Sequence, residues 1–508
     1  MARSDQDKTT PAPLSAFRLK VIGAFGAASI FQVIGAATHI LFTAILSRLL
    51  TPAEIGAATS AQLFTSILAS VCILGFSSTL VQAVKLTDEA VAAVSTIVLV
   101  SGFVFLGIAL IAAPWVAAWF RDAQLIGPVR FMGLICVANC IGFVPVSLLR
   151  RQLKAAQLGA IELTSGIIGL GLVSIPLAIA GAGMWAQIAG SVAIAWSKAM
   201  IAYAIVRPTS GYSLNLKPAV QFFTKAFGFS MSSLLQSVTG QTDRLAVGRW
   251  LGAANLGQYS AGSSLTAFPV TMFAAIAERV IFPAFAALQL ERERLAAAFL
   301  EAIALLALVC LSVSAVMAAT APQIVAVVLG KQWVLAAAPM AILAPMFYLR
   351  IAERTCASLL RGVGRVFILS ATQLLFGLLT LGACFVGSQF GLKGVAIGVL
   401  SACFCSWLVL VIAVMRTLKL RPGSILLAHA PGLVMAGLTG GAALTASRAA
   451  DAVGAVAFFN LAAAGLAAGV VGLVALLIAP RWFLGHRSMM FIEGALATAR
   501  QRLRPSRA

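Results

Sequence analysis

The chain has 508 residues, of which 61% are hydrophobic and only 10% are charged, with a formal net charge of +21 and a mean hydropathy of +1.01. This composition excludes an ordinary set of soluble domains and indicates a polytopic membrane protein. The lysines and arginines lie mostly in short gaps between apolar runs, not in a patch with aromatic residues. They therefore predict membrane topology and a preference for anionic lipid surfaces, and not nucleic-acid binding.

The first twenty residues are polar and contain four basic side chains. The apolar run that follows is longer than the ~7 to 15 residues of a secretory signal core, so we expect an uncleaved first helix. With a requirement of about 20 apolar residues per spanning helix, the sequence predicts an all-α fold with about fourteen transmembrane helices. They cover residues 22–46, 56–84, 91–119, 126–149, 160–180, 184–206, 220–247, 256–287, 296–320, 334–360, 366–389, 394–415, 425–446 and 453–479.

Basic residues are distributed unequally between the two sets of alternate loops, thirteen against six. The basic termini join the richer set, and loops rich in lysine and arginine stay in the cytoplasm. We therefore expect a multi-pass protein of the bacterial cytoplasmic (inner) membrane with both termini in the cytoplasm.

An internal repeat divides the chain. The stretch S-R-L-L-T-P-A-E-I-G at Ser47–Gly56 recurs as G-R-W-L-G-A-A-N-L-G at Gly248–Gly257, and S-L-L-R at Ser147–Arg150 recurs at Ser358–Arg361. Six predicted helices separate the copies, so both copies enter the membrane from the same side and the repeat is parallel.

The repeat predicts four regions. They are an N-terminal lobe of helices 1–6 (1–210), a C-terminal lobe of helices 7–12 (211–421), two additional helices (422–480) and a basic cytoplasmic tail (481–508). Apolar residues at helical spacing in the tail predict an interfacial helix.

No catalytic site is suggested by the sequence. It contains no phosphate-binding loop of the G-x-x-x-x-G-K-[ST] kind and no plausible triad, so ATP-driven transport by this chain alone is excluded. All eight cysteines lie in apolar runs and only three histidines are present, so neither a disulfide framework nor a metal site is predicted. We expect no cofactor, although a coupling ion, H⁺ or Na⁺, stays open.

Charges inside predicted spans are the candidate site, because a charged side chain at bilayer depth costs roughly 2.5 to 3.5 kcal/mol and normally faces a cavity or a partner. Helix 10 places Arg350, Glu353 and Arg354 on one face, and Arg350 lies about 16 Å from the cytoplasmic end at Arg361. A cationic face of this kind would attract a doubly charged head group. The candidates are His39, Lys198, Asp243, Arg244, Glu278, Arg279, Arg350, Glu353 and Arg354.

Each candidate also has a structural interpretation. Arg279, Arg350 and Arg354 would either contact substrate or form intramembrane ion pairs with Glu278 and Glu353. The pair Asp243 and Arg244 lies near the far surface and favours a helix-end role, and His39 favours a hydrogen-bonded packing role over a proton relay. Lys198 would either extend its amine to the membrane surface or line the interior.

The motif T-D-R-L-A-V-G-R-W-L-G-A-A-N-L-G-Q-Y-S at Thr242–Ser260, together with the motif at Ser47, F-P at Phe282 and E-R-E-R-L at Glu291, resembles the polysaccharide-transport flippases. These belong to the multidrug, oligosaccharidyl-lipid and polysaccharide exporter superfamily. The resemblance covers nearly the whole chain.

It implies two lobes around a cationic central cavity that opens alternately to either side. The substrate it implies is an undecaprenyl-pyrophosphate-linked oligosaccharide for exopolysaccharide or lipopolysaccharide biosynthesis. It also implies a groove by the last helices for the lipid tail, and a polysaccharide polymerase and a chain-length regulator as partners.

Two other functions compete with a flippase. A cation-coupled multidrug exporter of the same superfamily would need an acidic residue deep in its cavity, and the first lobe offers only Glu162 near a helix end. A glycan polymerase or ligase would need an extended outer loop, and every predicted outer loop is short.

Overall fold

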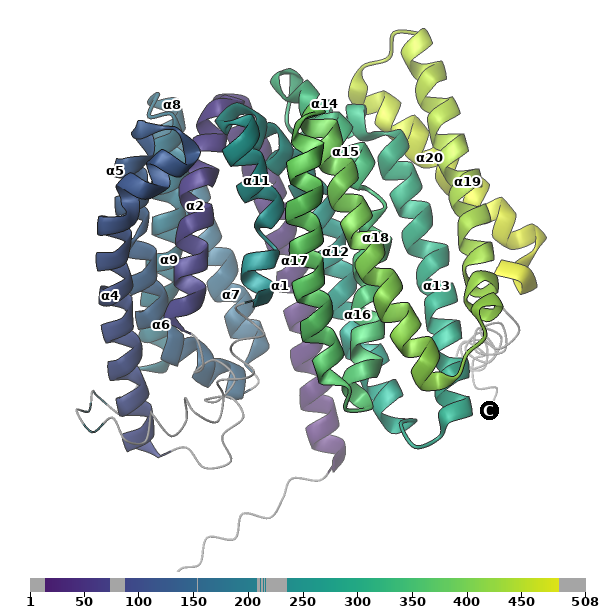
Figure 1. Cartoon of the computed structure of the whole chain (residues 1–508), viewed down its shortest axis with the longest axis horizontal. Helices are drawn as coiled ribbons and strands as arrows, with labels where there is room; N and C mark the ends of the chain where they lie inside the picture. Colours follow the sequence, from purple (N-terminus) through teal and green to yellow (C-terminus); the bar gives the residue numbers. More distant parts are fainter. Residues whose placement is uncertain are drawn as a thin grey trace, which may run out of the picture. The chain divides into compact units, whose positions relative to one another are not determined.

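A computed structural model of the chain describes residues 14–73, 87–152, 154–207, 211, 213, 215 and 235–483. Every regular element within these ranges is a helix, as the hydropathy pattern predicts (Figure 1). Eleven of the described helices are long and apolar enough to cross a membrane, or up to twelve if the bent pair Lys331–Leu343 and Met346–Gly362 forms one span. The all-α polytopic membrane fold is therefore confirmed, and the exact count of fourteen is not.

Three predicted spans account for the difference from eleven, and two of them remain when the bent pair is counted as one span. The span 220–247 lies largely outside the described residues. The span 256–287 corresponds to α12 (Ala253–Ala287), which has 35 residues but is not among the eleven. The span 334–360 corresponds to the bent pair, whose two halves meet at an angle of 43° beside Pro345.

The chain divides into two compact units. Unit 1 comprises Met1–Phe42, Leu68–Ala112 and Val129–Met231, and unit 2 comprises Thr43–Ile67, Ala113–Pro128 and Ser232–Ala508. The long helices α1 (Leu14–Leu49), α2 (Pro52–Cys72) and α4 (Asp88–Phe120) each contribute to both units. These units do not test the repeat boundary that the sequence predicts near residue 210. That boundary stays a prediction.

Unit 1 is built around α6 (Leu134–Arg151) and α9 (Met184–Val206), which pack along each other. The short helix α5 (Ile126–Met132) precedes α6. The next predicted span is continuous but not uniform: α7 (Ala155–Gly166) passes into a π-helical stretch (Ile167–Ser174) and then into α8 (Ile175–Ile179). Such wide turns leave backbone carbonyls less regularly paired and are often found at functional sites.

Unit 2 contains most of the described helices. In chain order they are η1 (Ala123–Leu125), α11 (Thr242–Leu251), α12, α13 (Arg292–Ala319), α14 (Ala321–Val328), η3 (Lys331–Ala336), α15 (Ala337–Leu343), α16 (Met346–Gly362), α17 (Val366–Ser388), α18 (Gly391–Leu418), α19 (Pro422–Ala452) and α20 (Ala457–Ile478). Its main core lies where α16 packs against α12, α13 and α18, around Phe299, Phe347 and Ile351.

The two copies of the repeated motif meet in unit 2, where α2 crosses α12. A Cβ atom at Gly56 would collide with the carbonyl oxygen of Ala253, and one at Gly257 would collide with the carbonyl oxygen of Pro52. The shift of 201 positions relates Gly56 to Gly257 and also Pro52 to Ala253. The contact is therefore reciprocal: each glycine lets its own helix approach the first turn of the other, and only glycine leaves the space.

A second reciprocal contact satisfies helix ends beside this crossing. At the end of α1, the Ser47 hydroxyl donates to the Leu329 carbonyl at 3.1 Å, and Arg48 Nη2 donates to the Val327 carbonyl at 2.8 Å. In return, the Trp333 indole donates to the Ser47 carbonyl at 2.6 Å, and the Gln332 amide donates to the Leu50 carbonyl at 3.0 Å. Carbonyls that a helix end leaves unpaired are thus satisfied by the other segment.

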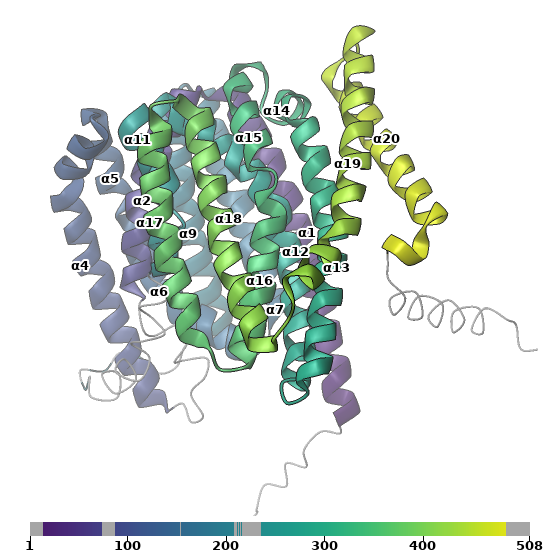
Figure 2. The same ribbon diagram turned by 45° about the vertical axis from the view of Figure 1, so that its right-hand side comes forward.

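The last two described helices pack as a pair at one edge of unit 2, α19 against α13 and α20 against α19 (Figure 2). They correspond to the two additional helices that the sequence predicts after residue 421. The tail helix predicted within 481–508 lies almost entirely outside the described residues.

Candidate functional site

The deepest charges in the described part of unit 2 lie on α16. Eleven of its seventeen residues are buried, because the helix packs against α12, α13 and α18. Arg350, Glu353 and Arg354 lie in its middle turns, as the i, i+3, i+4 spacing predicts. The surrounding residues are apolar, so these charges need partners within the protein.

Arg350 and Glu353 form an ion pair. Arg350 Nη1 lies 3.1 Å from Glu353 Oε2, and the two side chains are 27% and 11% exposed. The guanidinium also lies over the Phe376 ring of α17, 4.3 Å from its centroid. A cation over an aromatic face contributes about 0.5 to 2 kcal/mol as water is excluded. The Arg350 guanidinium is thus held on one side by a carboxylate and on another by a ring.

Arg354 lies one turn further along α16 and is exposed. Its charge lies within electrostatic reach of the Glu353 carboxylate. Among its own side chains, this part of α16 carries two cations and one anion. That is the electrostatic character required of a site for a phosphate or an acidic sugar.

Asp243 and Arg244 lie in the first turn of α11 and are half-buried. The hydroxyl of the fully buried Tyr259 donates to Asp243 Oδ2 at 2.9 Å. Arg244 Nη2 lies 3.4 Å from the Ser263 hydroxyl, a long hydrogen bond. Both contacts connect α11 to α12, and Asp243 also lies within electrostatic reach of Arg350.

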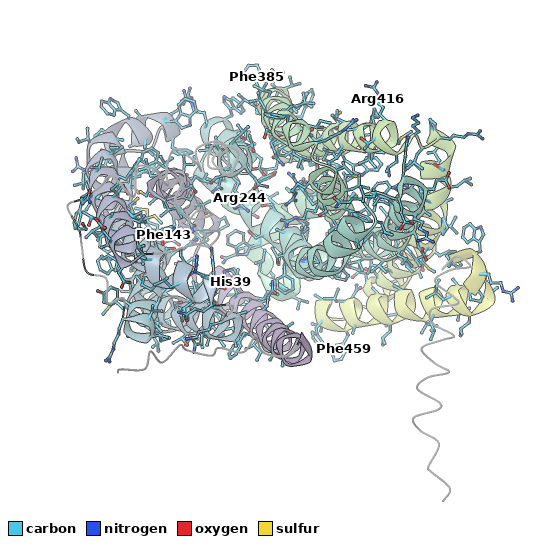
Figure 3. The ribbon with its side chains drawn as sticks, turned by 90° about the horizontal axis from the view of Figure 1, so that it is seen from below. His39, Phe143, Arg244, Phe385, Arg416 and Phe459 are labelled. Atoms are coloured by element: carbon cyan, nitrogen blue, oxygen red, sulfur yellow. The ribbon has the colours of Figure 1, made fainter. Side chains whose placement is uncertain are left out.

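The other predicted candidates are on other helices. Glu278 and Arg279 are in the helical part of α12 whose side chains lie outside the description. His39 is an exposed residue of α1 in unit 1. Lys198 of α9 forms an ion pair with Glu162 of α7 at 3.2 Å, with side chains 32% and 59% exposed. In the view from below, Figure 3 labels His39 and Arg244, and shows Arg416 projecting outward at the rim of unit 2.

The sequence-based candidates omit a buried polar cluster in unit 2 centred on His429 of α19. The Nδ1–H of His429 donates to the Ile425 carbonyl at 2.7 Å, which leaves Nε2 to accept the hydrogen bond from the Tyr348 hydroxyl of α16. The Trp407 ring of α18 lies 5.6 Å from the histidine ring. A lone histidine in the apolar run 425–446 was the available signal, since a polar group at that depth requires a partner. The cluster ties α19 to the helix that carries Arg350.

Sequence comparisons show that the chain is similar to proteins of polysaccharide biosynthesis. A family model described as "Polysaccharide biosynthesis protein" matches residues 45–338, more than half of the chain. The teichuronic acid biosynthesis protein TuaB of Bacillus subtilis (strain 168) is 26% identical over 62% of this chain and 66% of its own length. The succinoglycan biosynthesis transport protein ExoT of Rhizobium meliloti (strain 1021) is 25% identical over 68% of this chain and 70% of its own length.

Solved structures share the fold at lower sequence identity. The lipid II flippase MurJ in an inward closed conformation has a TM-score of 0.72 at 14% identity, covering 90% of this chain and 99% of that one. An inward-facing multidrug resistance transporter of the MATE family has a TM-score of 0.59 at 18% identity, covering 77% of this chain and 99% of that one. At these identities the likeness concerns the fold alone.

Proposed function

Because the chain belongs to the polysaccharide biosynthesis protein family matched above, we propose that it is a flippase for lipid-linked oligosaccharides. It moves undecaprenyl-pyrophosphate-linked repeat units across the bacterial cytoplasmic membrane by alternating access. The product serves exopolysaccharide or lipopolysaccharide biosynthesis, with a polymerase and a chain-length regulator acting after it. Its termini lie in the cytoplasm, and an ion gradient, H⁺ or Na⁺, is the energy source.

The observation that carries this proposal is the positive charge on α16. Arg350 and Arg354 lie beside the carboxylate of Glu353 inside a membrane fold, so the charged side chains of α16 itself are more positive than negative. Away from bulk water, a charge-assisted contact from guanidinium to phosphate is considerably stronger than in solution. The pyrophosphate that joins the lipid to the sugar is the part of the substrate that requires such a contact.

The competing function as a cation-coupled exporter fits this site less well. An exporter of cationic drugs would need an acidic group that is not already neutralised. The deeply buried carboxylate of α16 is paired with Arg350, and Asp243 accepts a hydrogen bond from Tyr259. Resistance of an overexpressing strain to cationic drugs, with no effect of gene deletion on surface polysaccharide, would favour the exporter.

The direct test is a complementation experiment. A strain without the gene should lose surface polysaccharide and accumulate the undecaprenyl-pyrophosphate-linked repeat unit, and the wild-type gene should reverse both effects. The double variant Arg350→Ala/Arg354→Ala should still insert, although it leaves Glu353 without its counter-ion, and it should restore about a tenth of the polymer or less, because two charge-assisted contacts to substrate are lost. The amount of folded protein in the membrane is measured alongside. Arg416→Ala, an exposed arginine at the rim of unit 2, is the matched control and should complement fully. Unchanged polymer and lipid intermediates after deletion would refute the flippase proposal.

A further inference from the structure

Three buried cysteines of unit 1 meet at the end of α2. Cys72 is the last residue of α2, and its side chain forms hydrogen bonds with the side chains of Cys136 and Cys140, which lie one turn apart on α6. No more than 4% of any of the three residues is exposed. Thiols that form hydrogen bonds across two helices are close neighbours, and closeness of this kind is the first geometric requirement for a disulfide.

Helix α4 holds this cluster in place (Figure 1). The Ser101 hydroxyl donates to the Cys72 carbonyl at 3.0 Å, a carbonyl that the end of α2 leaves without a helical partner, and lies 3.9 Å from the Cys140 sulfur. One residue further on, a Cβ atom at Gly102 would lie 3.0 Å from the same sulfur, so the backbone of α4 passes close to it. Contacts from three helices therefore order the thiols before any bond between them forms.

Cys140 also borders a pocket within unit 1. The pocket has a volume of ≈ 30 Å³, and its lining includes Ser95 of α4, Cys140 of α6, Tyr203 of α9 and Gly211. A space of this size has room for about two water molecules or for a neutral molecule of similar size. Tyr203 and Gly211 flank Arg207, which belongs to the set of basic loops, so the pocket lies toward the predicted cytoplasmic end of the unit.

The pocket distinguishes Cys140 from cysteines in the other unit. A thiol buried in apolar surroundings is normally inert, and one reason is that reagents do not reach it. Cys310, Cys356 and Cys403 are of this kind, because they belong to the apolar core of unit 2. Cys140 is equally buried, but it adjoins a space that a small molecule can occupy, and a second thiol lies next to it.

We propose that Cys140 and Cys72 form a peroxide-sensitive thiol pair. Hydrogen peroxide in the pocket transfers one oxygen to the Cys140 sulfur, which becomes a sulfenic acid, and the rest of the peroxide leaves as water. The Cys72 sulfur then attacks the sulfenic sulfur, and the hydroxyl group leaves with the thiol proton as a second water. Two thiols and one peroxide thus give one disulfide and two waters. The bond holds the last residue of α2 on α6, and the proposal does not depend on the flippase function.

The size of the pocket limits the class of oxidant. Hydrogen peroxide is neutral and close to water in size, so it fits the available space. Oxidised glutathione is charged and many times larger, so it should not reach Cys140 in the folded protein. All eight cysteines are free in the structure, in keeping with a sequence that predicts no disulfide framework. The bond therefore forms only on exposure to peroxide.

The experiment treats the full-length protein in lipid nanodiscs with hydrogen peroxide, unfolds it in detergent and counts the remaining thiols with a maleimide. The reference protein carries Cys405→Ser, because Cys405 is exposed, and so keeps seven of the eight thiols. It should lose two, and mass spectrometry should find Cys72 linked to Cys140. Adding Cys140→Ser should abolish the loss. Adding Cys72→Ser should leave one modified thiol, a sulfenic acid that dimedone labels after unfolding. Adding Cys310→Ser, the matched control in the core of unit 2, should not prevent the loss of two.

Three results would overturn the thiol pair. One is that all seven thiols of the reference protein survive an exposure that fully oxidises Cys405 in the wild type. Another is a disulfide that contains Cys136 and not Cys140, or an equal loss of thiols after Cys140→Ser. The third is an equal loss with oxidised glutathione, which would show that access does not depend on the pocket. Equal melting temperatures exclude misfolding of the serine variants, and Cys140→Ala provides a second variant with the same expected result.

Discussion

At the scale of single residues, the ion pair between Arg350 and Glu353 shows how this chain keeps charge inside a membrane. The carboxylate is nearly inaccessible and its partner is stacked on Phe376. Removing one member of such a pair leaves the other without compensation, which costs more than the pair itself contributes. The pair therefore fixes the position of Arg350 more than it adds net stability.

This argument predicts the effect of Glu353→Gln. The variant should lower the free energy of unfolding by about 2 to 4 kcal/mol, because Arg350 keeps its charge but loses its counter-ion. The matched control is Glu162→Gln in the Lys198 pair of unit 1, where the carboxylate is 59% exposed and the expected change is within about 1 kcal/mol. Thermal unfolding in detergent compares the two variants, and equal shifts would contradict the structural importance of the deep pair.

At the scale of elements, the crossing of α2 and α12 depends on the absence of two side chains. Gly56 and Gly257 occupy equivalent positions in the two repeats, and each is in contact with the backbone of the other helix. In a membrane, where helices gain little from apolar burial, such close backbone contact is a principal source of association. The repeated motif that the sequence reveals is thus also a contact between its own two copies.

Alanine in place of a glycine inside a helix usually stabilises a protein, but at Gly56 and Gly257 we expect it to destabilise this one. Gly56→Ala should destabilise the protein by about 1 to 3 kcal/mol, because the added methyl group collides with the Ala253 carbonyl. Gly441→Ala in α19, where a Cβ meets nothing within 4 Å, should instead be neutral or stabilise by up to about 1 kcal/mol. Melting temperatures of the two variants test this, and a stabilised Gly56→Ala protein would disprove the close crossing.

At the scale of the whole molecule, membrane orientation follows from the distribution of basic loops. We expect Lys331→Cys, in a background without the eight native cysteines, to react with a membrane-impermeant maleimide in intact cells. Arg365→Cys should react only after the membrane is permeabilised, because it lies in the loop set richer in basic residues. Both positions are exposed, so accessibility within the protein does not limit either reaction. The reverse labelling pattern would show that the chain has the opposite orientation in the membrane.

Much of the fold could be predicted from the sequence, because hydropathy determines which segments are long enough to span a membrane and the repeat is visible in Ser47–Gly56. The i, i+3, i+4 spacing also predicted that Arg350, Glu353 and Arg354 share a face. The sequence could not show that Arg350 pairs with Glu353 and stacks on Phe376, since that depends on how α16 and α17 pack. His429 was missed for a similar reason: its partners Tyr348 and Ile425 become neighbours only through helix packing and helical pitch.

The division of the chain has a mechanical consequence. Among the described residues, the borders between the two units fall inside α1 after Phe42, inside α2 after Ile67, inside α4 after Ala112 and inside the short helix α5 after Pro128, so four helices pass from one unit into the other. Relative motion of the units must therefore flex helical rods and cannot rely on slack loops alone. Pro114, two residues beyond the border in α4, lacks the amide hydrogen that would stiffen this point. We therefore expect α4 to bend near Pro114 when the two units move.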